Sequence, residues 1–354
     1  MLHLHTLWYV IIAFFWTGFF VLEGFDFGVG MLHAVVGRDH DERQLALSTI
    51  GPWWDGNEVW LVVAGAATFA AFPSWYATMF STLYLALVLI LAGLMFRGSA
   101  LEFGDKVTAQ WRRAWRWALI LASGAVPLLL GVGLGDLLTG LPINRSHNFT
   151  GTFFSLLTPY GLWTGVTLLI LSLLHGATFL SLRTTGPVHL RSRAAARWTS
   201  WAAVAAVLGF VIWTRAVAGG KFGLPVPALA VLAVLGTAWL AHSDQDGWSF
   251  AGSAVTMGAS LVSIFAALFP NVMVSSTNAA YDLTVSNAAS GSYALKVMTI
   301  TAVIFVPLVL LYQGWSFHVF RGRISASPAD PAAVAGASDA GPPPAGPVAA
   351  TPGS

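Results

Sequence analysis

The 354-residue sequence contains no cysteine and few charged residues. The absence of cysteine excludes disulfides, iron–sulfur clusters, thiolate-bound metals and covalently attached c-type haem. Charged residues make up 9% of the chain, whereas a soluble domain carries about 25%. So little charge cannot solvate the surface of a soluble protein of this length. This excludes a cytosolic enzyme, a nucleic-acid-binding protein and a disordered regulator, and it leaves a polytopic membrane protein.

Long apolar runs occupy most of the chain. A membrane-spanning helix needs about 20 mostly apolar residues, and nine runs meet or approach that length. They lie at about 7–31, 53–72, 76–98, 113–138, 158–182, 199–217, 225–241, 249–269 and 294–319. The runs are continuously apolar, which argues against the alternating strands of a membrane barrel. The first run lacks a basic flank and a small-residue cleavage site, so we expect a retained span rather than a signal peptide. The sequence therefore predicts an all-α integral membrane protein with about nine transmembrane helices.

Basic residues are unevenly divided between the two sides of these spans. The segments that follow odd-numbered spans hold 13 of the 17 Lys and Arg residues. The positive-inside rule then places the N-terminus outside and the C-terminus in the cytoplasm. On the outer side, the polar loop at about 271–292 is expected to be ordered.

The composition changes at about Ser325. Residues 325–354 are rich in Ala, Pro and Gly and contain no aromatic residue. Such a segment cannot bury a core, so we predict a disordered cytoplasmic tail. Residues 1–324 form the predicted transmembrane domain.

Four acidic residues lie within the predicted spans. Glu23 and Asp26 stand three apart in VLEGFDFGVG and share a helix face, and Asp55 and Glu58 stand three apart in GPWWDGNEVW. An embedded charge costs roughly 2.5–3.5 kcal/mol on insertion scales, which suggests a function. With the predicted topology both pairs lie toward the cytoplasm. Four carboxyls with few basic neighbours cannot all stay ionised in a low dielectric, and a water-linked set would provide a proton path.

A structural interpretation stays open for each of these groups. Asp55 and Glu58 can act as caps of the second span, where the helix dipole favours anions. Glu23 and Asp26 can hydrogen-bond to a neighbouring helix. Arg97, at the end of the third span, is either an anchor that snorkels to the interface, an ion-pair partner, or a hydrogen-bond donor to a quinone carbonyl.

Two other features of the spans concern packing. His175 is embedded in the fifth span, where a hydrogen-bonded packing role is favoured over haem ligation. Small residues let helices approach closely in membranes. We expect such contacts at Gly28, Gly30, Gly65 and Gly93.

Several long segments resemble subunit II of the cytochrome bd quinol oxidases. They are EGFDFGVGML (23–32), GPWWDGNEVWLVVAGAATFAAFPSWYA (51–77), LMFRG (94–98), LRTTGPVHLRSRA (182–194), FPNVMVSST (269–277) and LKVMTITAVIFVPLVLLYQGWSFHVFRGRI (295–324). The resemblance covers roughly residues 5–324, and the WDGNEVW region is its most specific part.

The resemblance implies a terminal respiratory oxidase of the bacterial cell membrane. The complex oxidises membrane quinol and reduces dioxygen to water with cytoplasmic protons, without pumping. Haem b and haem d belong to subunit I, the partner of this chain. Whether small accessory subunits also attach is left open by the sequence. Subunit II is implied to have two four-helix bundles and a peripheral helix. It supports assembly and contributes acidic residues to a proton route.

The resemblance also assigns roles to residues. Asp55 is the Asp of the WDGN motif, and Glu23 and Asp26 match the acidic pair of the first helix. Some members hold a quinone near positions that match Asp26, Trp54 and Arg97.

Trp60 lies on a segment that resembles the lining of a dioxygen route. The resemblance implies no catalytic residue and no metal ligand in this chain.

Two other functions remain possible from the sequence. One is a proton-coupled secondary transporter, whose embedded acids would bind and release substrate by alternating access. The other is a purely structural subunit whose acids only determine packing.

Overall fold

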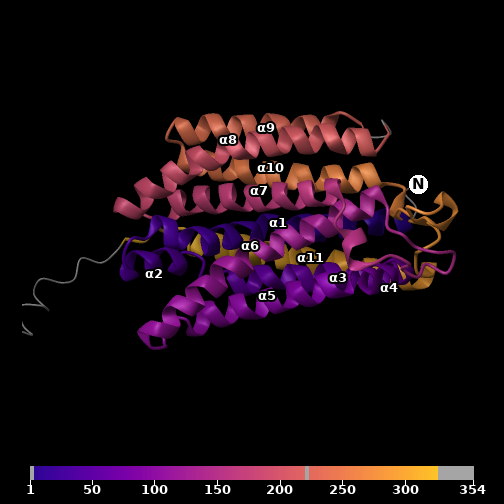
Figure 1. Cartoon of the computed structure of the whole chain (residues 1–354), viewed down its shortest axis with the longest axis horizontal. Helices are drawn as coiled ribbons and strands as arrows, with labels where there is room; N and C mark the ends of the chain where they lie inside the picture. The colour runs from indigo at the N-terminus through magenta and orange to yellow at the C-terminus, as the bar shows by residue number, and fades with distance from the viewer. Residues whose placement is uncertain (1–3, 220–222, 326–354) are drawn as a thin grey trace, which may run out of the picture.

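The computed structural model describes residues 4–219 and 223–325. Its elements in chain order are α1 (Leu4–Val36), α2 (His40–Ser48), α3 (Trp54–Ala71), α4 (Pro73–Thr82), α5 (Tyr84–Phe103), α6 (Ala109–Thr139), η1 (Phe153–Leu156), α7 (Pro159–Arg183), α8 (Gly186–Val217), α9 (Pro225–His242), α10 (Asp246–Leu268), β1 (Asn271–Met273), η2 (Ala279–Tyr281), β2 (Leu283–Thr284) and α11 (Ser292–Val319). The long helices run along one common axis (Figure 1). Apart from Ser325, the predicted tail at 325–354 lies outside the described residues.

Most of these helices are suited to a membrane. Within the described ranges, eight helices are long and apolar enough to cross one: α1, α5, α6, α7, α8, α9, α10 and α11. The prediction of an all-α, multi-pass membrane protein is confirmed. The span predicted at 53–72 is not among the eight. It forms α3, which has 18 residues like α9 but is less apolar, because Asp55, Asn57 and Glu58 lie in its first two turns.

Two other predicted boundaries are wrong, and one helix was not predicted. The span predicted at 76–98 is divided at Leu83 into α4 and α5. The sixth span begins far ahead of residue 199, because α8 starts at Gly186. The short helix α2 is the unpredicted one, although its N-cap is regular: the Asp39 carboxylate accepts a hydrogen bond from the Glu42 amide at 2.8 Å.

The long helices pack around α7. This helix contacts α1 and α6 on one side and α8 and α10 on the other, and α9 packs on α8 and α10. Figure 1 places α8 and α9 at one flank and α3, α4 and α5 at the opposite flank. Because α7 joins both groups through continuous contacts, the expected division into two four-helix bundles stays a prediction.

Glycines allow the closest crossings of α7. A Cβ atom on Gly28 would lie 2.6 Å from the Gly176 Cα, and one on Gly131 would lie 2.6 Å from the Gly165 Cα. The α1–α7 and α6–α7 crossings therefore require glycine. The expected close contact at Gly28 is confirmed. The one expected at Gly65 is wrong, because a Cβ atom there would meet nothing within 4 Å.

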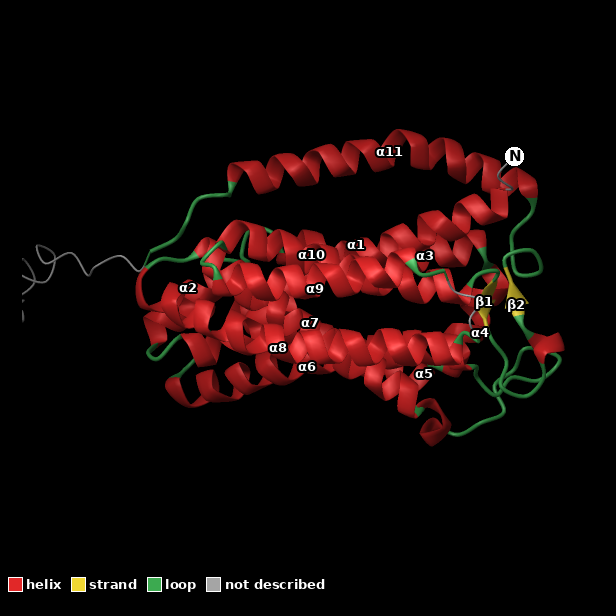
Figure 2. Ribbon diagram, turned by 90° about the horizontal axis from the view of Figure 1, so that it is seen from above, coloured by secondary structure: helices red, strands yellow, loops and turns green. Residues whose placement is uncertain are grey.

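The last helix, α11, lies apart from the others along most of its length (Figure 2). It is attached mainly near its two ends. At the first end the Trp8 indole donates hydrogen bonds to the Leu295 carbonyl at 3.1 Å and the Thr299 hydroxyl at 3.0 Å. At the other end Phe317 stacks on Trp53 with ring centroids 5.1 Å apart. Between these contacts most side chains of α11 are exposed.

The polar loop between α10 and α11 is ordered, as predicted. Its strands β1 and β2 pair antiparallel. Backbone hydrogen bonds tie the loop to the end of α6: Leu141 donates to Val274 and Ser276 donates to Leu141, each at 3.0 Å. The Asp282 carboxylate accepts from the Ser275 amide at 2.8 Å.

Candidate functional site

Three of the four predicted acidic residues meet in one cluster. Glu23 and Asp26 project from α1 toward α3 and α5, where they meet Glu58 and Arg97. The side chains of Glu23, Asp26 and Arg97 have no solvent exposure, and that of Glu58 is 25% exposed. The three-residue spacing on α1 therefore directs both of its acids to one buried site, as the sequence predicted.

Arg97 is the basic partner of this cluster. Its guanidinium forms an ion pair with Glu23, and its Nη1 lies 3.6 Å from Oε2 of Glu58. Its Cζ also lies 5.0 Å from the ring centroid of Phe27. The guanidinium does not extend to the membrane interface, because it is fully buried inside the molecule and lies more than one turn before the end of α5 at Phe103. The anchor interpretation is wrong and the ion-pair interpretation is confirmed.

Two amides extend the cluster toward α11. The Asn57 Nδ2 donates to Oδ2 of Asp26 at 2.8 Å and to the Leu22 carbonyl at 3.2 Å. The Gln313 Nε2 donates to Oδ1 of Asn57 at 3.0 Å. Asp26 is thus joined through Asn57 to the last helix of the chain.

Asp55 does not belong to the buried cluster. It is exposed in the first turn of α3, and the first turn has no side-chain cap. It lines a hollow of about 580 Å³ together with Trp54, Glu102 and Gln313. Gln313 therefore touches both the hollow and the hydrogen-bonded chain that leads to Asp26. An interaction of Asp55 with the α3 dipole alone stays possible.

Gln313, Glu102 and the role of Asn57 were not predicted from the sequence. Gln313 had a visible signal, since it is a lone amide within the apolar run LVLLYQGW. A polar side chain in such a run is costly unless it finds a partner. The partner itself was not visible, because Asn57 and Gln313 are 256 residues apart.

The residues expected near a quinone are not gathered around one cavity. Trp54 is half-buried and lines two of the cavities, whereas Asp26 and Arg97 are fully buried in the acidic cluster. Trp60 is 7% exposed and packs edge-on against Phe14 and Phe15, with centroids 5.9 and 6.2 Å away.

An apolar cavity of about 430 Å³ is lined by Leu61, which follows Trp60 in the chain. Trp16, Leu61, Phe80 and Leu134 are among its lining residues, but Trp60 is not.

His175 does not fit a haem ligand. Its Nδ1 lies 2.7 Å from the Ser253 hydroxyl and its Nε2 lies 3.0 Å from the Val21 carbonyl, so both ring nitrogens are engaged. His33, which the sequence analysis overlooked, is 2% exposed and bonds through Nδ1 to the Gly30 carbonyl at 2.8 Å. In the part of the chain that the structure describes, no group of three or more His, Asp or Glu residues is placed to hold a metal ion.

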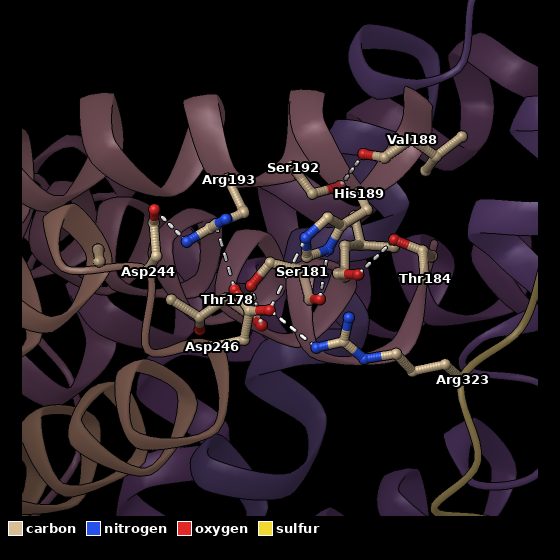
Figure 3. A network of polar contacts seen from close by, with 12 residues as sticks. Thr178, Ser181, Thr184, Val188, His189, Ser192, Arg193, Asp244, Asp246 and Arg323 are labelled. Carbon is tan, nitrogen blue, oxygen red and sulfur yellow. Dashed lines mark hydrogen bonds and ion pairs between the residues drawn. The ribbon is translucent and has the colours of Figure 1, made fainter. Parts of the chain in front are cut away.

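A separate polar network ties together the chain segments at the end of the molecule where α2 lies (Figure 3). Arg323 donates to Asp246 at 2.8 Å, Arg193 lies 3.4 Å from the same carboxylate and also pairs with Asp244, and Arg197 donates to Asp244 at 2.7 Å. The Arg197 hydrogen bond and the Arg193 charge lower the pKa of Asp244 below its usual value. The network links α8 and α10 to the segment after α11.

Comparisons with known proteins agree with this architecture. The family described as cytochrome bd terminal oxidase subunit II matches residues 4–320. The chain is 42% identical to the cytochrome bd ubiquinol oxidase subunit 2 of Bacillus subtilis over 338 residues, covering 92% of this chain and 98% of that protein. It is 35% identical to the cytochrome bd-I ubiquinol oxidase subunit 2 of Escherichia coli over 367 residues, covering 91% and 95%.

A solved structure shows the same fold. A chain of the bd oxidase from Geobacillus thermodenitrificans superposes with a TM-score of 0.73 at 15% identity, covering 90% of this chain and 98% of that one. The match of the family to nearly all the described residues, together with relatives at 35–42% identity, is decisive. The chain belongs to the cytochrome bd terminal oxidase subunit II family.

Proposed function

We propose that this chain is the non-haem subunit of a quinol:dioxygen oxidoreductase, in which it supports assembly and conducts cytoplasmic protons toward the haem site of subunit I. Membership of the oxidase family supports the respiratory role and leaves the transporter alternative without support. The engagement of both His175 nitrogens by hydrogen bonds supports placing haem b and haem d in the partner.

One observation carries the proton role. A continuous polar chain runs from the hollow lined by Asp55 through Gln313 and Asn57 to Asp26, which has no solvent exposure. Buried polar chains of this kind are costly to maintain in a membrane protein. A packing role alone would not require one end to open on an acidic hollow.

The charges of the cluster favour bound protons. Arg97 supplies one positive charge against the three carboxyls of Glu23, Asp26 and Glu58. It therefore balances only one of them, and protons neutralise the others because an unpaired buried charge is strongly unfavourable. A cluster that already holds exchangeable protons can pass one inward and take one up from the hollow.

Each group then has a distinct task. Asp55 and Glu58 collect protons at the entrance, and Glu23 and Asp26 pass them toward the partner subunit. Amides do not take up or release protons near neutral pH. Asn57 and Gln313 therefore orient Asp26 and the water that carries the proton past them. Reduction of dioxygen to water consumes one proton for each electron, and haem in the partner supplies that redox chemistry.

Two lesser roles belong to the same proposal. A quinone headgroup would approach from the hollow that Trp54 and Asp55 line, with Arg97 and Asp26 as the buried polar groups nearest in the acidic cluster. Dioxygen would pass along apolar surface near Trp60. The N-terminus of the chain would face outward and its C-terminus the cytoplasm.

The test is an Asp55→Asn variant of the assembled complex, measured by quinol-driven oxygen consumption. We expect severalfold slower turnover with unchanged haem spectra. The loss should grow as the pH rises, because a path without its collecting carboxylate depends more on the bulk proton concentration.

Asp41→Asn is the matched control, because Asp41 is an exposed carboxylate of α2 at the same end of the molecule and does not line the hollow. It should leave turnover unchanged. Wild-type turnover and pH profile in Asp55→Asn would remove Asp55 from the path and support the purely structural interpretation of the acids.

A further inference from the structure

A cavity other than the two described above lies at the end of the molecule that holds α2 and the hollow lined by Asp55, near the point where α1 ends. Its volume is about 270 Å³, and its walls come from α2, the start of α3, the end of α5 and the start of α6. Three arginines line it: Arg43, Arg112 and Arg116. The cavity lies where the membrane-spanning helix α5 ends and α6 begins, at the end of the molecule that we expect to face the cytoplasm.

The arginines are not neutralised by the protein. Arg43 donates to two backbone carbonyls, those of Gly37 at 3.0 Å and Arg38 at 2.6 Å, so its guanidinium is held in place but keeps its charge. Within residues 4–219 and 223–325, the exposed side chain of Arg112 and the half-buried side chain of Arg116 have neither an ion-pair partner nor a hydrogen-bond partner. Two unpaired guanidiniums on the wall of one cavity indicate an anionic ligand.

The acidic residues of the cavity do not cancel this charge. Glu102 and Asp105 are its two carboxylates, and Asp105 is already in contact with His40 at 2.9 Å. The three arginines outnumber them. Arg112 and Arg116 are also four residues apart, which places both on one face of α6.

The ligand must be apolar as well as anionic. Trp54, Trp115 and Leu119 form apolar parts of the wall. Farther along α5, one helical turn before the lining residue Ala100, the apolar side chain of Phe96 is 57% exposed. A soluble anion would gain nothing from this surface, whereas an acyl chain would cover it.

We propose that this cavity binds an anionic phospholipid, with the phosphate held by Arg112 and Arg116 and an acyl chain lying along α5. Basic pockets between transmembrane helices on the cytoplasmic side recognise acidic lipid headgroups in this way. The fixed guanidinium of Arg43 adds a third positive charge at the back of the site. The cavity shares Trp54 and Glu102 with the hollow that Asp55 lines, but Glu23, Asp26 and Arg97 of the buried acidic cluster do not line it.

The test compares lipid retention by the whole complex, purified and reconstituted with equal amounts of phosphatidylglycerol and phosphatidylcholine. Bound lipid is identified by native mass spectrometry. Each basic residue near an anionic surface contributes a preference of about fivefold, so Arg112→Gln with Arg116→Gln should weaken phosphatidylglycerol retention about 25-fold. The matched control is Lys106→Gln with Arg113→Gln, which removes the same charge at the same end from residues that do not line the cavity.

The outcomes separate the proposal from its alternatives. Loss of retention in the Arg112/Arg116 pair with retention in the control pair supports it. Equal loss in both pairs means general surface attraction and overturns it, as does equal retention of phosphatidylcholine by the wild type. Displacement of the lipid by millimolar inorganic phosphate would assign the site to a soluble anion, and displacement by a quinone would assign it to that ligand.

A single substitution keeps the test valid if the double variant does not assemble. Arg112 is exposed and unpaired, so Arg112→Gln leaves no buried group without a partner. We expect about fivefold weaker retention of phosphatidylglycerol in this variant. Unchanged retention would overturn the proposal.

Discussion

The buried ion pair between Arg97 and Glu23 can be tested by removing its members one at a time and together. In Arg97→Met, the Glu23 carboxylate stays in a site with no solvent exposure and loses its cation. Breaking a buried pair in this way costs about 3–5 kcal/mol. The lost contact with the Phe27 ring at 5.0 Å adds about 1 kcal/mol. The more distant, partly exposed Glu58 contributes little.

The double variant with Glu23→Leu and Arg97→Met should recover most of this stability. It removes both charges and fills their space with apolar atoms, which is often neutral or stabilising for a buried pair. The two substitutions are therefore expected to be strongly non-additive. Turnover should not recover, because the proposed path loses Glu23. A complex that is stable but slow would separate the structural role of the pair from its role in proton transfer.

Thermal unfolding of the purified complex, followed by intrinsic fluorescence at one scan rate, measures these effects. At about 2 °C per kcal/mol, Arg97→Met should lower the melting temperature by roughly 8–12 °C. The haem spectrum before heating shows whether each variant has assembled. A shift below about 2 °C in Arg97→Met, or a double variant no more stable than Arg97→Met alone, would refute the reasoning.

Two further predictions concern packing and pH. Gly176→Leu should prevent the close α1–α7 crossing, because a Cβ atom at Gly176 would already overlap the Gly28 backbone. We therefore expect gel filtration to show loss of the assembled complex. Gly65→Leu is the control and should assemble normally, because a Cβ atom at Gly65 would meet nothing within 4 Å. The pKa of Asp244 is lowered by its Arg197 hydrogen bond, so this carboxylate stabilises the fold above the ordinary Asp pKa of about 4 and loses that effect as the pH falls through the lowered value. Asp244→Asn should therefore flatten the fall in melting temperature at acidic pH, and an unchanged acid dependence would contradict the assignment.

The sequence was sufficient for the class of fold and for much of the site. Three-residue spacing on a helix fixes a shared face, so the positions of Glu23 and Asp26 in the chain already assign them to one buried site. Arg97 stood out because a charge inside an apolar run needs a partner. The interruption at Leu83 was not foreseeable, since neither proline nor glycine marks it. The end of α3 was foreseeable, because Pro73 follows the run predicted at 53–72 and the helix ends at Ala71.

Contacts between distant parts of the chain could not be predicted from one sequence. The amide pair of Asn57 and Gln313 and the stacking of Trp53 on Phe317 both depend on where α11 lies. Local periodicity carries no information about which helices become neighbours. The same limit applies to the cavity proposed to bind an anionic lipid. Its arginines come from two helices, α2 and α6, that are far apart in the chain.

The attachment of α11 near its two ends has a consequence for biosynthesis. Gln313 belongs to α11, which follows every other described helix in the chain, so the polar chain to Asp26 cannot form until α11 has been synthesised. A nascent subunit without this helix would present the Asn57 amide and the Trp53 ring without their partners. Docking of α11 therefore completes the buried polar chain after the helices that hold its other members have been made.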